Sequence, residues 1–121
     1  MNSSLFTPYK LGPVTLRNRT IRSAAFESMG KDFGPTQQLK DYHVSVARGG
    51  IGMTTLAYAA VCRSGLSFNK QLWLRPEIVP GLRGITDAVH REGAAAAIQI
   101  GHCGNMTHWT TAGQMPIRAS T

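Results

Sequence analysis

Three short runs of small and polar residues, each following an apolar segment, are the positions in this chain best suited to chemistry. They are Ser23-Ala24-Ala25, Ala57-Tyr58-Ala59-Ala60 and Gln99-Ile100-Gly101-His102. If the preceding segments are parallel strands, all three ends open on one side of a sheet, where ligands of such folds bind. Small side chains there leave room for a flat ring, and the glutamine amide both donates and accepts hydrogen bonds. The pattern predicts a site for a flat cofactor.

The same residues have a purely structural interpretation, which stays open at this point. Alanines at strand ends are commonly the small members of interdigitating core layers. Gln99 would then bond to neighbouring backbone or to a buried water, because an unsatisfied amide costs roughly 1–3 kcal/mol. Only the coincidence of three adjacent strand ends favours a ring-shaped ligand.

His102 and the two cysteines carry weaker signals. His102 has no nucleophile or carboxylate partner visible in the sequence, so we expect it to bond to nearby backbone rather than act as a general acid. Cys62 and Cys103 lie far apart with no CxxC spacing, which predicts two free thiols and neither a zinc site nor a disulfide. This cysteine usage favours a reducing, cytoplasmic compartment.

Three strands and two helices are predicted to position the strand ends. The strands cover residues 18–25, 51–60 and 94–100, and the second is apolar without alternation, as in strands buried on both faces. One helix begins after Thr36 and ends at Gly49-Gly50, with a stripe of Leu39, Tyr42 and Val46. The other begins near residue 76, ends at Gly93 and buries Leu82, Ile85 and Val89.

The remaining segments are predicted to be a hairpin and loops. Leu5-Phe6-Thr7-Pro8 is expected to be extended, and the Gly12-Pro13 pair predicts a turn between two short strands. Residues 64–73 and 101–121 are expected to be loops. Strands alternating with helices imply right-handed parallel crossovers. Three such strands cannot cover their own faces and edges, so we expect more sequence or another chain to complete the fold.

Charge and hydropathy exclude two classes of partner. The chain of 121 residues has a formal charge of +7, yet its cations are scattered singly without interleaved aromatic residues. Nucleic-acid binding is therefore not expected. No run of apolar residues is long enough to span a bilayer, and the N-terminus has no apolar signal segment, so we expect a soluble protein without membrane association.

Several short motifs follow one another along the chain: Leu5-Phe6-Thr7-Pro8-Tyr9, Leu16-Arg17-Asn18-Arg19, Gly49-Gly50-Ile51-Gly52-Met53, Pro76-Glu77 and Ile98-Gln99-Ile100-Gly101-His102-Cys103-Gly104. Together they resemble the opening of the Old Yellow Enzyme family of FMN-dependent NADH:flavin oxidoreductases. The resemblance implies an α/β fold, with residues 1–121 forming the N-terminal part of a single FMN-binding (β/α)8 TIM-barrel domain. This part would hold the N-terminal hairpin and about three βα units of an incomplete barrel.

The resemblance also implies cofactors, substrate and site residues. FMN would take hydride from NAD(P)H and pass it to a small-molecule substrate, an activated alkene. The cofactor-binding positions would be Ala24, Ala25, Phe26, Tyr58 (or its neighbour Ala57) and Gln99, with Gln99 at the pyrimidine edge of the flavin. Ala25 and Phe26 depart from the family pattern. The family's substrate-binding His-x-x-His or His-x-x-Asn pair, its proton-donating Tyr and its phosphate loop would lie beyond Thr121.

Two alternatives stay open beside this interpretation. A truncated, non-catalytic binding or assembly module would leave the protein colourless, whereas the enzyme would carry flavin. A doubly wound nucleotide-binding sheet is disfavoured because no GxGxxG follows a strand.

Overall fold

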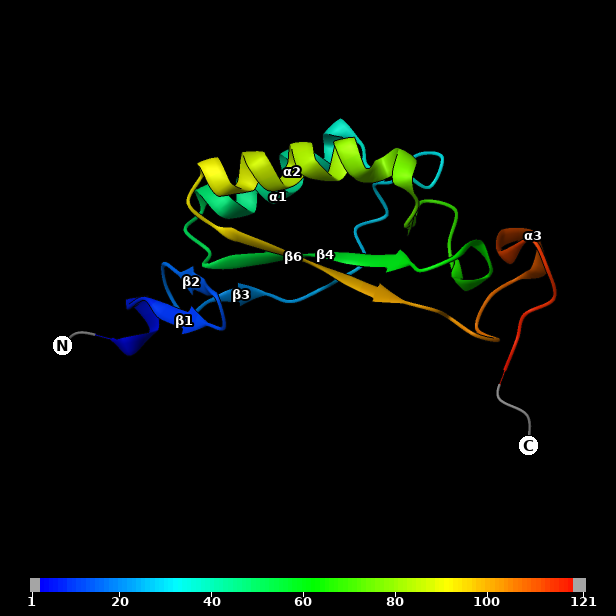
Figure 1. Cartoon of the computed structure of the whole chain (residues 1–121), viewed down its shortest axis with the longest axis horizontal. Coiled ribbons are helices and arrows are strands. Elements are labelled where there is room, and N and C mark those ends of the chain that lie inside the picture. Colours follow the sequence, from blue (N-terminus) through cyan, green and yellow to red (C-terminus); the bar gives the residue numbers. More distant parts are fainter. Residues whose placement is uncertain (1–2, 119–121) are drawn as a thin grey trace.

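A computed structural model describes residues 3–118 of the chain. The elements follow in the order η1 (Ser4–Phe6), β1 (Tyr9–Leu11), β2 (Val14–Leu16), β3 (Ile21–Arg22), α1 (Gln37–Arg48), β4 (Met53–Ala60), η2 (Arg63–Gly65), β5 (Leu72–Trp73), η3 (Pro76–Ile78), α2 (Val79–Arg91), β6 (Ala95–Gly101) and α3 (Trp109–Ala112). Figure 1 shows β3, β4 and β6 running in one direction, with α1 and α2 together on one face. The predicted α/β class and the three parallel strands are confirmed.

Strand β4 is the centre of the sheet and is paired on both edges. Its first residue, Met53, pairs with Ile21 of β3 on one edge and with Ala95 of β6 on the other. Near its carboxyl end, Ala59 pairs in parallel with Leu72 of β5. The prediction that residues 64–73 are all loop is therefore wrong at its end, because a two-residue strand is too short to leave a sequence pattern.

Strand β3 is much shorter than the predicted strand at residues 18–25. The Asn18 side chain accepts a hydrogen bond from the Thr20 amide at 3.1 Å and donates one to the Gly50 carbonyl at 2.7 Å. The bond to the Thr20 amide ends the ladder on its N-terminal side. At the other end, the Arg22 guanidinium donates to the Thr55 carbonyl at 2.7 Å and occupies a backbone group that a longer ladder would use. The ladder therefore covers only Ile21 and Arg22, and the chain leaves the sheet edge after them.

The ends of the helices follow from capping and glycine. Thr36 is the N-cap of α1, and its hydroxyl accepts a hydrogen bond from the Leu39 amide at 3.1 Å. Gly50 and Gly93, which follow α1 and α2, have φ angles of 101° and 85°. Only glycine adopts this left-handed conformation without strain, so both helices end where the sequence predicted.

The buried stripe of α1 differs from the predicted one. Leu39, His43 and Ala47 are buried, whereas the predicted Tyr42 and Val46 are only half-buried. The difference has a polar cause. His43 is fully buried because both of its ring nitrogens have hydrogen-bond partners, described below.

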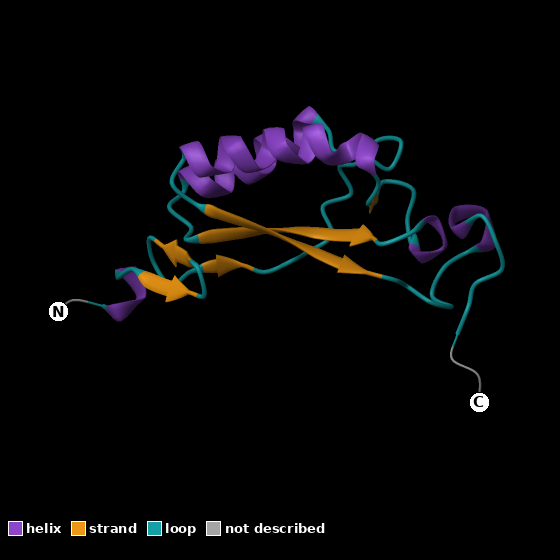
Figure 2. Ribbon diagram, in the orientation of Figure 1, coloured by secondary structure: helices purple, strands orange, loops and turns teal. Residues whose placement is uncertain are grey.

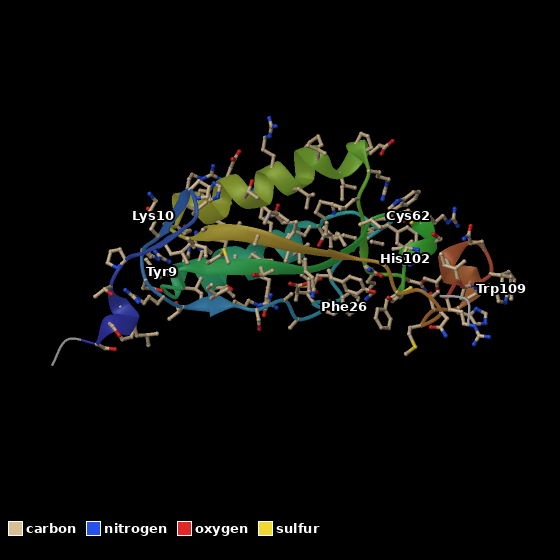
Figure 3. All side chains as sticks on the ribbon, turned by 60° about the horizontal axis from the view of Figure 1, so that its bottom comes forward. Tyr9, Lys10, Phe26, Cys62, His102 and Trp109 are labelled. Carbon is tan, nitrogen blue, oxygen red and sulfur yellow. The ribbon has the colours of Figure 1, made fainter. Side chains whose placement is uncertain are left out.

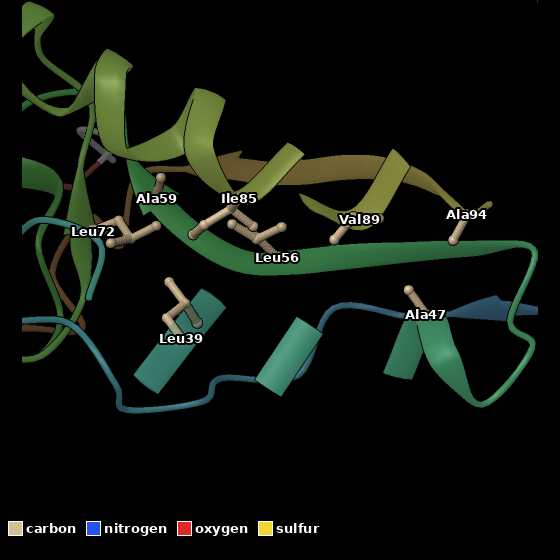
Figure 4. Close-up of a cluster of buried hydrophobic side chains, with 8 residues drawn as sticks. All are labelled: Leu39, Ala47, Leu56, Ala59, Leu72, Ile85, Val89 and Ala94. Carbon is tan, nitrogen blue, oxygen red and sulfur yellow. The ribbon is translucent and has the colours of Figure 1, made fainter. Parts of the chain in front are cut away.

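The hydrophobic core lies between the two long helices and the sheet, as Figure 4 shows. Its buried members are Leu39, Ala47, Leu56, Ala59, Leu72, Ile85, Val89 and Ala94. Within residues 3–118 no helix covers the opposite face of the sheet (Figure 2). A parallel sheet is normally covered on both sides, so this face is where further structure, or a ligand, has room.

The N-terminal hairpin lies at the end of the sheet where the parallel strands begin (Figure 1). Strands β1 and β2 pair antiparallel around Gly12, whose φ is 58°. Before them, the predicted extended segment is wrong at Leu5 and Phe6, which lie in the 3-10 helix η1, where the Ser3 hydroxyl accepts a hydrogen bond from the Leu5 amide at 3.3 Å. It is correct at Thr7, whose backbone is extended.

Arg17 joins the end of the hairpin to the helix layer. Its guanidinium donates to the carbonyls of Ala47 near the end of α1, Ile51 before β4, and Glu92 at the end of α2. One side chain therefore satisfies carbonyls at the carboxyl ends of both long helices, where cations are favoured. No helix in the described part of the chain is long and apolar enough to cross a membrane.

Candidate functional site

A β-bulge marks the carboxyl end of β4. Leu56 pairs with Ile98 of β6 and Ala59 pairs with Ile100, so two residues of β4, Ala57 and Tyr58, oppose one residue of β6. That residue is Gln99. Bulges re-aim side chains and free backbone groups, and they are over-represented next to active sites. The structure thus brings three of the residues singled out from the sequence to one place.

Gln99 lies on the uncovered face of the sheet. Ala96 and Ile98 pack against the core under the helices, and alternation along β6 turns Gln99 the other way. The residue is exposed, and its side-chain amide has no hydrogen-bond partner among residues 3–118. An amide with free donors and acceptor on an open sheet face matches the chemistry of a heterocycle edge.

The Tyr58 side chain extends from the bulge past the end of β6 to the loop between β4 and β5. A Cβ atom at Gly101 would lie 3.4 Å from the Tyr58 ring, an ordinary contact distance, so the ring packs beside the end of β6. The tyrosine hydroxyl bonds to Ser67, whose amide donates to the buried Gln71 side chain at 2.7 Å. The side chain therefore anchors the loop between β4 and β5, and it leaves the backbone of the bulge as the part able to face a ligand.

The predicted residues after β3 lie beside the bulge, on the other edge of β4. The Ala25 carbonyl accepts a hydrogen bond from Arg22 at 3.2 Å, and Ala24 is half-buried. Phe26 stacks on Phe68 of the loop, with ring centroids 4.9 Å apart and planes 22° apart. Both rings stay exposed, and Figure 3 labels Phe26 on the side of the sheet away from α2.

Glu27 links these segments and was missed by the sequence analysis. Its side chain is only 3% exposed, and its Oε1 atom accepts hydrogen bonds from Arg22 at 3.2 Å, from His43 at 3.0 Å and from the Ala57 amide at 3.3 Å. Burial alone would raise the pKa of the Glu27 carboxyl, but the bonds from His43 and Ala57 outweigh it and hold the pKa below its usual range. The carboxylate is therefore ionised at neutral pH.

His43 completes this network from the helix side. Its Nε2 atom faces the Glu27 carboxylate and therefore carries a proton, and its Nδ1 atom lies 2.8 Å from the hydroxyl of Thr54 in β4. The one available sequence signal was the spacing of His43, four residues after Leu39 on the inner face of α1.

His102 has the partner expected from the sequence, together with a second one. Its Nδ1 accepts a hydrogen bond from the Gly104 amide at 3.0 Å, and its Nε2 lies 3.2 Å from the Ser64 hydroxyl. Cys62 contacts the same hydroxyl at 3.1 Å, and Cys62 and Cys103 are both free thiols, as predicted. Figure 3 places Cys62 and His102 together, at the opposite end of the molecule from Tyr9.

Comparison with known proteins gives this geometry a family context. Residues 4–116 match the model of the NADH:flavin oxidoreductase / NADH oxidase family. A 4,4'-dithiodibutanoate disulfide reductase of Rhodococcus erythropolis is 48% identical over 101 residues, which are 84% of this chain and 25% of the relative. A probable N-methylproline demethylase of Rhizobium meliloti is 43% identical over 120 residues, 98% of this chain and 18% of the relative.

The fold is shared with solved structures as well. An Old Yellow Enzyme homologue from Zymomonas mobilis superposes with a TM-score of 0.85 at 25% identity, covering 94% of this chain and 32% of that one. The predicted resemblance and the predicted fold class are therefore confirmed. The chain corresponds to an N-terminal portion of a TIM barrel, and it spans a quarter or less of the two curated relatives described above.

Proposed function

The chain belongs to the NADH:flavin oxidoreductase / NADH oxidase family, and we propose that the complete protein is an FMN-dependent oxidoreductase that passes hydride from NAD(P)H to an activated alkene. Residues 1–121 would supply the N-terminal part of its single FMN-binding barrel domain and would be inactive alone. The observation that carries this proposal is the meeting of the bulge at Ala57 and Tyr58 with the free amide of Gln99 on the open face of the sheet.

The residues at this place fit a flavin. Gln99 would bond to the pyrimidine edge, and the backbone of Tyr58 or Ala57 would contact the ring from the neighbouring strand. Ala24 and Ala25 leave space beside it, and Phe26 forms an apolar rim. When bound, FMN supplies the hydride relay between nicotinamide and substrate, while the protein supplies orientation and exclusion of water.

A second acceptor class is favoured by one comparison. The Rhodococcus relative, 48% identical to this chain, is named as a disulfide reductase. A small organic disulfide is therefore the other electron acceptor that we propose to test beside an activated alkene.

The test begins with the purified complete protein. Bound FMN near one equivalent, followed by oxidation of NADH or NADPH that depends on an added alkene or disulfide, supports the proposal. A colourless protein that binds no added FMN would contradict it and would favour the non-catalytic module.

The role of Gln99 is tested by one matched pair of variants. Gln99→Leu removes the amide from the sheet face, and we expect the Kd for FMN to rise about tenfold, since one good hydrogen bond is worth about 1–1.5 kcal/mol. Gln38→Leu makes the same change at an exposed position on the first turn of α1, and its Kd should equal that of the wild type. Equal affinities for all three proteins would refute the assignment of Gln99.

A further inference from the structure

One oxygen atom of Glu27 accepts hydrogen bonds from three elements of the structure. The donors to its Oε1 are Arg22 of β3, His43 of α1 and the amide of Ala57 in the bulge of β4. The carboxylate is 3% exposed and the His43 side chain is fully buried, so little solvent competes for these bonds. Hydrogen bonds to an ionised acceptor in such surroundings are stronger than neutral ones.

The bond to Ala57 concerns the candidate site most directly. Ala57 lies in the bulge, where β4 has lost its one-to-one pairing with β6. Its amide faces the β3 edge, where the ladder ends at Arg22 and Thr54, and it donates to Glu27 at 3.3 Å, so the carboxylate takes the place of a carbonyl that a longer β3 would supply. The next residue is Tyr58, and the peptide unit between them is part of the predicted cofactor contact.

Glu27 also fixes the segment after β3, residues 25–26, which forms the other side of the candidate site. Phe26 immediately precedes it, and Arg22, which bonds to the carboxylate, also donates to the carbonyl of Ala25. Fixing the Glu27 side chain therefore fixes the position of residues 25–26 relative to residues 57–58. Residues 25–26 follow β3 and residues 57–58 belong to β4, and the ladder between these strands covers only Ile21 and Arg22, so no ladder pairs the two segments.

We propose that Glu27 is a positioning residue for the flavin, one that holds the bulge of β4 and the segment after β3 at the spacing the ring requires. The inference rests on the proposed function and goes beyond it, because it assigns a role to a residue that does not itself face the ring. The pKa of Glu27, held below its usual range, keeps the carboxylate charged and bonded at neutral pH.

The experiment compares two substitutions in the same buried network of the complete protein. Glu27→Gln keeps the shape but removes the charge that holds the bulge. Thr54→Val is nearly isosteric and removes the hydroxyl from the far end of His43, away from Ala57. Both should lower the melting temperature, whereas only Glu27→Gln should weaken FMN binding, by about tenfold, or about 1.4 kcal/mol.

The readouts are the FMN dissociation constant and the visible absorption of the bound flavin, both measured well below the melting temperature of each variant. For Thr54→Val we expect a Kd within about twofold of the wild type and an unchanged spectrum. If Glu27→Gln does not fold, Glu27→Asp keeps the charge but draws the carboxylate back from Ala57 by one methylene. The same rise in Kd is then expected.

Two results would overturn the inference while leaving the proposed function intact. Wild-type affinity in a folded Glu27 variant would show that the network does not position the ring. An equal rise in Kd for Thr54→Val would show that lost stability alone explains the effect. Failure of the wild-type protein to bind FMN would instead contradict the proposed function itself.

Discussion

Replacement of the half-buried Arg17 by methionine should destabilise the protein far more than the same replacement of the exposed Arg19. The guanidinium donates to three carbonyls, at 2.7 Å to Glu92, at 3.0 Å to Ile51, and to Ala47. A Cβ at position 93 would lie 2.7 Å from an Arg17 nitrogen, so the side chain is closely fitted between the hairpin and the helix ends. Methionine keeps much of the apolar stem and removes all the donors.

The expected cost follows from these contacts. A hydrogen bond to a charged group contributes roughly 1.5–3 kcal/mol, and a cation at a helix carboxyl end adds about 0.3–1 kcal/mol. Arg17 is half-buried, so water replaces part of what is lost. We therefore expect the free energy of unfolding to fall by about 3–5 kcal/mol, a large share of the total of a typical domain.

The assay is urea unfolding of the complete protein, with Arg19→Met as the control. Arg19 is exposed, and its guanidinium lies over the Tyr9 ring at 5.1 Å, a contact worth about 0.5–1 kcal/mol. FMN affinity should be unchanged in both variants, because the hairpin lies at the other end of the sheet from the candidate site. If Arg17→Met costs no more than Arg19→Met, the assignment of Arg17 as the link between hairpin and helices is wrong.

Three further perturbations test other parts of the structure. The pKa of Glu27 is lower in the folded than in the unfolded state, so its contribution to the free energy of unfolding is present at neutral pH and is lost as pH falls below about 4. In urea titrations between about pH 6 and pH 3, the wild type should therefore lose more stability than Glu27→Gln. Parallel pH curves for the two proteins would refute this. Gly93→Ala, at a φ of 85°, should lower the melting temperature because alanine is strained in this conformation. Gly84→Ala lies inside α2, where a Cβ meets no atom within 4 Å, and should stabilise the protein by about 0.5–1 kcal/mol. Equal effects of the two substitutions would contradict the argument from backbone conformation. Thr36→Ala removes the acceptor for the Leu39 amide and should cost about 1 kcal/mol in thermal unfolding, with Thr36→Ser close to wild type.

The alternation of strands and helices could be predicted because each element carries its own local signal. Thr36 and the glycines after the helices define helix ends from within a few residues, and β4 is apolar along its length. The parallel order then follows from the short connections. Strand β5 carried no such signal, since its two residues are held only by pairing with the end of β4.

The candidate site was predictable in part, for a related reason. Gln99 and Tyr58 could be named because strand ends are visible in a sequence, but the bulge that brings them together is a property of register between strands. Glu27 and His43 are sixteen residues apart, and their bond depends on how α1 packs on the sheet. Single-sequence patterns contain no such information, so a buried polar network of this kind becomes visible only in the folded structure.

The central claim is that the carboxyl ends of β3, β4 and β6 hold the flavin ring. An experimental structure of the complete protein with FMN bound tests it most directly. We expect the pyrimidine edge of the ring within about 3.2 Å of the Gln99 amide, with the backbone of Ala57 or Tyr58 beside the ring. A flavin bound elsewhere, or a Gln99 side chain directed away from it, would contradict the claim.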